Sequence, residues 1–186
     1  MGEHFILYSL DAGNAFDRSY REGIFASLKL KGIRGKMLRA LRDLYEGGAT
    51  KIQIGGKKSR PFVLYSGTKQ GTVLGPLLFV LSMEELLKVL RESGCGFSFA
   101  GKWWPGFLFI DDLLLVVTST VELEKLLTIV REFTYKWKMV LNHTKDAATS
   151  YGLMTELVEW SKVTPLLADV VREDVPRDAL KYLGFM

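Results

Sequence analysis

Apolar residues recur along the chain in patterns that predict short strands and amphipathic helices. Phe5–Leu10 is a short apolar run that ends on Asp11, the pattern of a buried strand with a carboxylate at its tip. Apolar residues spaced three and four apart predict helices over 20–30 and 35–46. The second helix is expected to bury one face, which consists of Met37, Leu38, Leu41, Leu44 and Tyr45.

The middle of the chain is predicted to contain a hairpin, a long helix and a further strand. The expected elements are, in order, a hairpin of Thr50–Ile54 and Pro61–Tyr65 around Gly55-Gly56-Lys57-Lys58, a helix from Pro76 to about Arg91, and a strand at Phe97–Ala100. A loop punctuated by glycines, Ser66–Gly75, connects the hairpin to the helix.

A second hairpin is predicted to turn on two carboxylates. Phe107–Ile110 and Leu113–Thr118 would be its strands, with Asp111 and Asp112 between them. The run Phe107–Ile110 is expected to lie in the core because it is entirely apolar.

The remaining pattern completes the fold class. Ser119 and Glu122 resemble a capping box, which predicts a helix over 120–139. Weaker patterns follow, and they indicate a strand at Ala147–Tyr151, a helix within 153–162 and a strand at Tyr182–Phe185. This order of elements predicts an α+β fold with helices packed on one face of an antiparallel sheet.

Composition places the chain among globular proteins. Of its 186 residues 48% are hydrophobic and 25% charged, and this length can bury a sizeable core in one domain. The single cysteine, Cys95, excludes an intrachain disulfide and a cysteine-based zinc site. No apolar run approaches the roughly 20 residues of a membrane helix, and no targeting signal is visible. We therefore expect an intracellular protein with no membrane partner.

Basic residues gather in one part of the chain. The net charge is +4, but residues 18–69 carry 13 Lys and Arg against three acids, whereas 102–186 carry ten basic and twelve acidic residues. This asymmetry is compatible with a polyanion partner such as nucleic acid, because positive charge attracts phosphates over long range. An ordinary solvated surface is the alternative interpretation. The candidate contacts are three residues on the polar face of the 35–46 helix and one at the end of the basic stretch, namely Lys36, Arg39, Arg42 and Lys69.

Three carboxylates would meet if the first strand lies beside the second hairpin. Like charges about 4 Å apart, such as Asp11 and its partners Asp111 and Asp112, repel by roughly 4 kcal/mol at an effective dielectric constant near 20. Mg²⁺ would remove this repulsion, and it prefers oxygen ligands shared with substrate phosphates. Two such ions about 3.5–4 Å apart can activate a hydroxyl and stabilise the leaving oxygen of a phosphoryl transfer. Asp is also a common turn residue, so the pair alone leaves both interpretations open.

Five segments resemble the palm motifs of reverse transcriptases, and they occur in that family's order. They are LDAGNAFDR (Leu10–Arg18), GTKQGTVLGP (Gly67–Pro76), FIDD (Phe109–Asp112), LNHTK (Leu141–Lys145) and KYLGF (Lys181–Phe185). The stretch GIRGKMLRALRDLYEGGATKIQIGGKKSRPF is similar to the corresponding region of non-LTR retrotransposon and group II intron enzymes. The sequence departs from the family pattern where Phe109 replaces the usual tyrosine, Gly75 a serine and His143 a proline.

The resemblance implies roles for individual residues. Asp11, Asp111 and Asp112 would hold two Mg²⁺ ions, or Mn²⁺ in their place. Phe16 matches the bulky residue that excludes a 2′-hydroxyl, and Lys145 matches a lysine that protonates the departing pyrophosphate. Gln70 and Gly71 match the loop that contacts the template and the incoming nucleotide. The segment that grips the primer end is matched by Tyr182, Leu183 and Gly184.

The resemblance also implies an activity and a domain organisation. The activity is RNA-directed DNA synthesis, with an RNA template, a DNA primer and deoxynucleoside triphosphates as partners. Residues 1–186 are expected to form one palm domain with a partial fingers segment at about 18–69. The thumb and most of the fingers are expected to be missing, and other regions or a protein partner would supply them. A nuclear or organellar location is implied for a eukaryotic host. The alternative function is a truncated or co-opted palm that binds nucleic acid, or acts structurally, without catalysis.

Overall fold

The computed structural model describes residues 5–12, 15–46, 48–68, 72–142 and 146–151, and it divides into two compact units. The first unit combines residues 1–13 with 84–186, and the second comprises 14–83. The predicted fingers segment at about 18–69 lies within the second unit, and its role stays a prediction. The helix predicted within 153–162 and the strand predicted at Tyr182–Phe185 lie outside the described residues.

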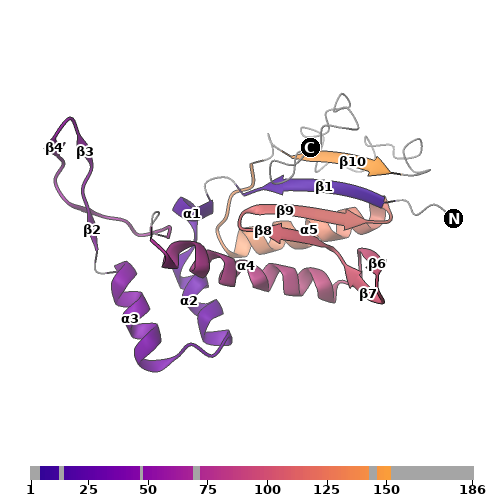
Figure 1. Cartoon of the computed structure of the whole chain (residues 1–186), viewed down its shortest axis with the longest axis horizontal. Helices are drawn as coiled ribbons and strands as arrows, with labels where there is room; N and C mark the ends of the chain where they lie inside the picture. Colours follow the sequence, from indigo (N-terminus) through magenta and orange to yellow (C-terminus); the bar gives the residue numbers. More distant parts are fainter. Residues whose placement is uncertain (1–4, 13–14, 47, 69–71, 143–145, 152–186) are drawn as a thin grey trace. The chain divides into compact units, whose positions relative to one another are not determined.

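The first unit is built on a four-stranded antiparallel sheet with the strand order β10-β1-β9-β8 (Figure 1). β1 is Phe5–Asp11, β8 is Gly106–Phe109, β9 is Asp112–Val117 and β10 is Ala147–Tyr151. β8 and β9 form a hairpin, and β1 lies between β9 and β10. The predicted first strand, the predicted strand at Ala147–Tyr151 and the α+β fold class are thus confirmed.

One face of this sheet forms the core of the first unit. Side chains of β1 alternate between buried and half-buried, and the register sets each buried one opposite a buried residue of β9. These pairs are Ile6 with Val117, Tyr8 with Leu115, and Leu10 with Leu113. Helix α5 (Thr120–Lys136) packs along β9 and buries its own apolar stripe, formed by Leu123, Leu126, Val130 and Phe133 (Figure 1).

The cap of α5 confirms most of the predicted capping box. Ser119 Oγ accepts a hydrogen bond from the Glu122 N–H at 3.3 Å. The Glu122 carboxylate accepts from the N–H and the hydroxyl of Thr118, at 2.9 and 2.8 Å, so it reaches one residue further back than a standard box. The helix ends at Lys136 rather than at 139, because Lys138 has a φ of 53°, which a right-handed helix cannot contain.

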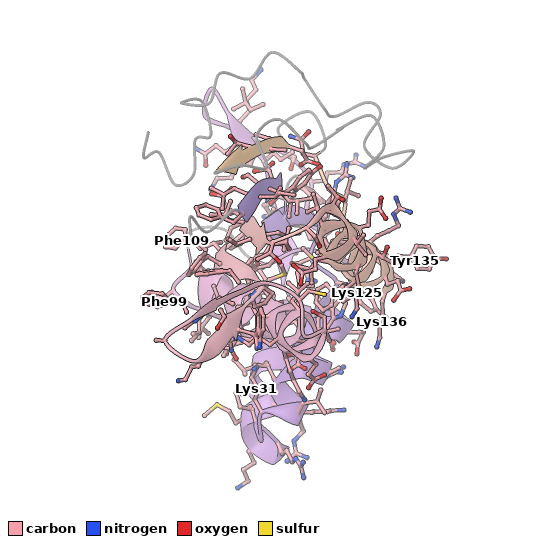
Figure 2. The ribbon with its side chains drawn as sticks, turned by 90° about the vertical axis from the view of Figure 1, so that its right-hand side faces the viewer. Lys31, Phe99, Phe109, Lys125, Tyr135 and Lys136 are labelled. Atoms are coloured by element: carbon pink, nitrogen blue, oxygen red, sulfur yellow. The ribbon has the colours of Figure 1, made fainter. Side chains whose placement is uncertain are left out.

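The opposite face of the sheet, here called the open face, lies away from α5, and the prediction of a buried Phe107–Ile110 run on it is wrong. Phe107 and Phe109 are 43% and 54% exposed, and Gly106 is the one buried residue of β8. A Cβ at Gly106 would lie 2.1 Å from the carbonyl oxygen of Leu114, so β8 and β9 approach each other closely there. Figure 2 shows Phe99 and Phe109 on the side away from Tyr135 and Lys136 of α5.

A short hairpin completes the described part of the first unit. β6 (Phe97–Phe99) follows the predicted strand at 97–100, and its partner β7 (Lys102–Trp104) was not predicted. Together with the open face of the sheet, β6 and β7 line a hollow of about 520 Å³. The described residues that line it are apolar apart from Ser98 and Thr118, and none of them is charged.

The second unit is a small helical cluster with a two-part hairpin. Its helices are α1 (Ala15–Arg18), α2 (Arg21–Leu30), α3 (Gly35–Glu46) and the first part of α4 (Leu74–Glu92). Their core contains Ile24, Phe25, Leu28, Leu38, Tyr45 and Leu78. In the hairpin, β2 (Ala49–Thr50) pairs with β5 (Phe62–Val63), and β3 (Gln53–Ile54) pairs with β4 (Lys57–Lys58).

Three details of the second unit differ from the sequence prediction. Met37 and Leu44 of α3 are 63% and 49% exposed, because the helix buries a narrower stripe around Leu38 and Tyr45. The tight turn consists of Gly55 and Gly56 alone, both with positive φ as a type I′ turn requires. α4 begins at Leu74, before Pro76, and the Thr72 hydroxyl accepts from the Gly75 N–H at 3.2 Å.

None of the helices within the described ranges is long and apolar enough to cross a membrane.

Candidate active site

Two of the three predicted carboxylates are direct neighbours across the centre of the sheet. Asp11 ends β1 and Asp112 begins β9, and the register pairs them with each other. Directly opposed residues of an antiparallel pair have Cβ atoms about 4.5–5.5 Å apart and project from the same face. That face is the open one, because the adjacent positions Leu10 and Leu113 point into the core. The condition stated from the sequence, that the first strand lies beside the hairpin, is therefore met.

Asp111 lies in the turn next to this pair. Because Phe109 pairs with Asp112, the two turn residues are Ile110 and Asp111, one position earlier than predicted. Ile110 has a φ of 59° and Asp111 does not have a positive φ, which matches a type II′ turn. That first turn position normally holds glycine, and a β-branched residue there is strained. The neighbouring strands therefore impose an unfavourable backbone conformation beside the carboxylates.

Backbone hydrogen bonds connect the end of β1 to two other segments. The Ala12 N–H donates to the Asp111 carbonyl at 3.3 Å, which ties the turn to β1. The Asn142 N–H donates to the Asp11 carbonyl at 2.9 Å, and Ala12 forms an isolated bridge with Leu141. The segment that leads toward Lys145 in the sequence is thus anchored beside Asp11 as far as Asn142.

A buried tyrosine lies near this end of the sheet, and sequence reasoning missed its role. The Tyr8 hydroxyl donates to Oδ2 of Asp146 at 3.2 Å, joining β1 to the residue that follows Lys145. Burial, reinforced by the charge and the hydrogen bond of Asp146, raises the pKa of Tyr8 far above its ordinary value. The hydroxyl therefore remains a donor at neutral pH. The only sequence signal was one hydroxyl-bearing ring on the apolar face of a strand.

The carboxylates offer oxygen ligands that suit a divalent metal ion. Mg²⁺ is commonly held by one or two carboxylates together with waters and substrate phosphates. In the described ranges, no three His, Cys, Asp or Glu side chains are arranged so that they could hold a metal ion on their own. The pair of Asp11 and Asp112, with Asp111 in the adjoining turn, is the donor set that the fold brings together. It fits a hard divalent cation that completes its coordination with phosphates.

In the second unit, Phe16 is fixed by its ring and by its backbone. The half-buried ring packs against Phe79, with 4.9 Å between ring centroids. The Phe16 carbonyl accepts from the Thr68 N–H at 2.7 Å and from Ser19 Oγ at 3.0 Å. The other predicted site residues of the nucleotide, leaving-group and primer regions lie outside the described residues; they are Lys69, Gln70, Gly71, Lys145, Tyr182, Leu183 and Gly184.

The three predicted cations of α3 do not behave alike. Lys36 and Arg39 are exposed. Arg42 instead forms ion pairs with Glu22 at 2.7 Å and Glu46 at 3.3 Å, and its guanidinium lies 4.8 Å from the centre of the Phe25 ring. Arg42 thus connects α3 to α2, whereas Lys36 and Arg39 face solvent.

Comparison with known families decides the identity of this fold and site. The family described as "Reverse transcriptase (RNA-dependent DNA polymerase)" matches residues 2–186. The chain belongs to the reverse transcriptase family.

The curated relatives of this reverse transcriptase domain come from non-LTR retrotransposable elements. It is 32% identical over 137 residues to the Pol polyprotein of element R2DM from Drosophila melanogaster, covering 74% of this chain and 13% of that protein. It is 32% identical over 144 residues to an R2 polyprotein from Popillia japonica, covering 76% of this chain and 20% of that protein. The reverse transcriptase domain thus spans a fifth or less of these relatives.

Solved structures support the reverse transcriptase fold. Apo telomerase from Candida tropicalis superposes with a TM-score of 0.65 at 12% identity, covering 81% of this chain and 31% of that one. Telomerase from Candida albicans, in complex with a fragment of telomeric RNA, gives 0.64 at 14% identity, covering 83% and 28%. At such low sequence identities the structural similarity supports the palm-like α+β fold and nothing more specific.

Proposed function

We propose that this domain adds deoxynucleotides to a primer 3′-hydroxyl under the direction of an RNA template. The observation that carries the proposal is the cross-strand pair of Asp11 and Asp112, with Asp111 in the turn, on a sheet face that α5 leaves open. Carboxylates buried in the core could not reach a nucleic acid, whereas carboxylates on this face can. Membership of the reverse transcriptase family supplies the class of reaction.

The three aspartates would hold Mg²⁺, or Mn²⁺ in its place, together with phosphate oxygens of the nucleotide. Two such ions, when bound, lower the pKa of the attacking hydroxyl and stabilise charge on the leaving oxygen. The register pairs Asp11 with Asp112, so a cation shared between the two carboxylates would offset their mutual repulsion. Asp111 would contribute from the turn.

In the proposed reaction the primer 3′-oxygen forms a bond to the α-phosphorus, and the bond from that phosphorus to pyrophosphate breaks. Lys145 would give a proton to the departing pyrophosphate, because an ammonium with a pKa near about 10 can both donate a proton and neutralise phosphate charge. Phe16 would exclude a 2′-hydroxyl. The template and nucleotide would meet Gln70 and Gly71, and the primer end would meet Tyr182, Leu183 and Gly184.

The partners proposed are an RNA template, a DNA primer and deoxynucleoside triphosphates. Lys36 and Arg39 are exposed cations of the basic stretch, and with Lys69 they would lie along phosphates of the template and primer. Arg42 would contribute mainly by holding α3 against α2, given its ion pairs with Glu22 and Glu46. Further regions, or a protein partner, would complete the grip, in the nucleus or an organelle of a eukaryotic host.

Primer extension tests the proposal directly. The wild-type chain, Asp11→Asn and the double variant Asp111→Asn/Asp112→Asn would extend a DNA primer on an RNA template in Mg²⁺ or Mn²⁺. We expect extension by the wild type and a loss of at least about 100-fold in both variants, because the ligands of the metal are removed. Asp43→Asn, the same change on the exposed surface of α3, is the matched control and should retain activity.

Two results would contradict the proposal. Undiminished extension by the Asp11 and Asp111/Asp112 variants would show that the carboxylates are not the catalytic ligands. A folded wild-type chain that binds the primer and template but does not extend the primer would favour a palm without catalysis.

A further inference from the structure

The guanidinium of Arg21, at the start of α2, donates to the backbone of two separate segments. Nε donates to the Gly67 carbonyl at 2.8 Å and Nη2 to the Ser66 carbonyl at 3.0 Å. Nη1 donates to the Tyr45 carbonyl at 3.0 Å and also to the Leu64 carbonyl. Only a guanidinium offers several N–H donors in one rigid plane, so lysine could not reproduce this set. Arg21 therefore joins the end of α3 to the segment Leu64–Gly67.

That segment is in turn bonded to the backbone around Phe16. The Gly67 N–H donates to the Ser19 carbonyl at 2.9 Å, and the Thr68 N–H donates to the Phe16 carbonyl at 2.7 Å. Ser66 Oγ adds a longer bond of 3.4 Å to the Asp17 carbonyl. The last residues before Lys69-Gln70-Gly71 are thus held by the same backbone that carries Phe16.

The contact between these two backbones is tight. Gly67 has a φ of 80°, and a Cβ there would lie 2.5 Å from the carbonyl oxygen of Asp17. Glycine is needed at this position both for its conformation and for its lack of a side chain. A shift of Leu64–Gly67 would therefore be transmitted to Asp17 and to Phe16 beside it.

The charge of Arg21 strengthens the connection. Burial lowers the pKa of Arg21, but arginine remains protonated in proteins at neutral pH. Hydrogen bonds from a charged donor are stronger than neutral ones. The guanidinium also lies 5.7 Å from the centre of the Tyr45 ring, a cation–π contact that adds to these hydrogen bonds.

We propose that Arg21 is a positioning residue for nucleotide selection, because it holds Leu64–Thr68 against Phe16–Ser19 and so fixes the backbone that carries the ring of Phe16. The inference rests on the proposed function for the role of Phe16. In this proposal Arg21 affects the discrimination between deoxynucleotides and ribonucleotides without touching either nucleotide itself.

The test compares Arg21→Met and Arg21→Lys with Arg91→Met, the same substitution at an exposed arginine of α4. Two quantities are measured in each chain: kcat and KM for a deoxynucleotide and its ribonucleotide, and hydrogen exchange at the Gly67 and Thr68 amides. In Arg21→Met we expect faster exchange at both amides and a preference for deoxynucleotides reduced about tenfold, since misplacement by about 1 Å can cost even more. KM should rise more than kcat falls, and Arg21→Lys should be intermediate.

The inference would be overturned if Arg21→Met matched Arg91→Met either in amide exchange at Gly67 and Thr68 or in its preference for deoxynucleotides. If Arg21→Met does not fold, Arg21→Lys and Gly67→Ala carry the test, because the added Cβ pushes Gly67 away from Asp17 and should give the same two changes. If the wild type fails to extend a primer, the proposed function has failed. Hydrogen exchange at the Gly67 and Thr68 amides then still tests whether Arg21 holds Leu64–Thr68 in place. If Arg21→Met leaves the exchange rates of both amides at their wild-type values, the inference is overturned.

Discussion

Tyr8 illustrates at the residue scale how the position of a side chain changes its chemistry. On the surface a tyrosine would titrate near pH 10, but in the core face of β1, beside Asp146, it stays neutral. Its hydroxyl can then serve as a permanent donor that ties β1 to the residue after Lys145.

This burial predicts a dependence of stability on alkaline pH. The unfolded chain loses the Tyr8 proton near pH 10, whereas the folded chain keeps it because the pKa is raised. The free energy of unfolding should therefore be fully maintained below about pH 10 and fall above it, by up to about 1.4 kcal/mol per pH unit from this residue. Urea unfolding of wild type and Tyr8→Phe between pH 8 and 11 checks this.

The Tyr8→Phe variant separates the contribution of Tyr8 to the pH dependence of stability from that of the other tyrosines. Tyr8→Phe should lose about 1 kcal/mol at neutral pH, the value of one hydrogen bond, and show a shallower decline above pH 10. Parallel curves for the two proteins across the alkaline range would contradict this account of Tyr8.

At the scale of elements, α3 separates two uses of positive charge. Arg42 has partners on α2 and α3 within the chain, whereas Lys36 and Arg39 are exposed on the helix. Partly exposed ion pairs such as those of Arg42 contribute little to stability, typically below about 1 kcal/mol. Exposed cations, by contrast, are free to displace counterions from a nucleic acid.

The salt dependence of binding distinguishes these two uses. In Lys36→Met/Arg39→Met, affinity for a primer–template should fall, and the slope of log affinity against log salt should become shallower by up to about two, because each phosphate that is no longer neutralised removes about 0.9 from the slope. Arg42→Met should keep close to the wild-type slope and lower the midpoint of urea unfolding. Fluorescence anisotropy at several salt concentrations measures the slopes, and identical slopes in wild type and the double variant would exclude the two residues from the interface.

Elements stabilised by local interactions could be predicted from sequence. The strand at Phe5–Leu10, the helix start at Ser119 and the strand at Ala147–Tyr151 each follow from neighbouring residues, and the structure confirms them. Phe107 and Phe109 were misplaced because an entirely apolar strand does not show which of its two faces a helix covers. The turn was misplaced because adjacent aspartates suggest a turn, whereas the register puts Ile110 there.

Only part of the candidate site could be predicted from the sequence. The nearness of Asp11 to Asp112 could be stated as a condition, since it required only that β1 lie beside the hairpin. Arg21 could not be found, because its acceptors are backbone carbonyls of residues far along the chain, which leave no mark on side-chain patterns. Tyr8 was missed because its partner Asp146 is 138 positions away.

At the scale of the whole molecule, binding of metal should stabilise the fold as well as enable chemistry. A cation that binds the folded chain and not the unfolded one adds RT ln(1 + [L]/Kd) to stability, about 1.4 kcal/mol at ten times Kd. For a chain of this size that corresponds to a rise in Tm of about 3–5 °C.

Thermal unfolding with and without Mg²⁺ therefore tests metal binding independently of activity. The wild type and Asp43→Asn should melt at a higher temperature in saturating Mg²⁺ than in EDTA, and Asp11→Asn should lose this difference. An equal rise in all three proteins would assign the effect to ions bound elsewhere.

The close approach of β8 and β9 at Gly106 determines how this part of the chain can tolerate insertions and deletions. With the Leu114 carbonyl occupying the space of a side chain, the hairpin has little freedom to slip. Inserting or deleting one residue within β9 would exchange its faces, turning Asp112 toward α5 and Leu113 outward. At the Gly55-Gly56 turn, where an added Cβ would meet nothing, changes in length cost far less. We therefore expect lineages of this domain to vary in length at the β3–β4 tip and to keep the spacing from Gly106 to Val117 fixed.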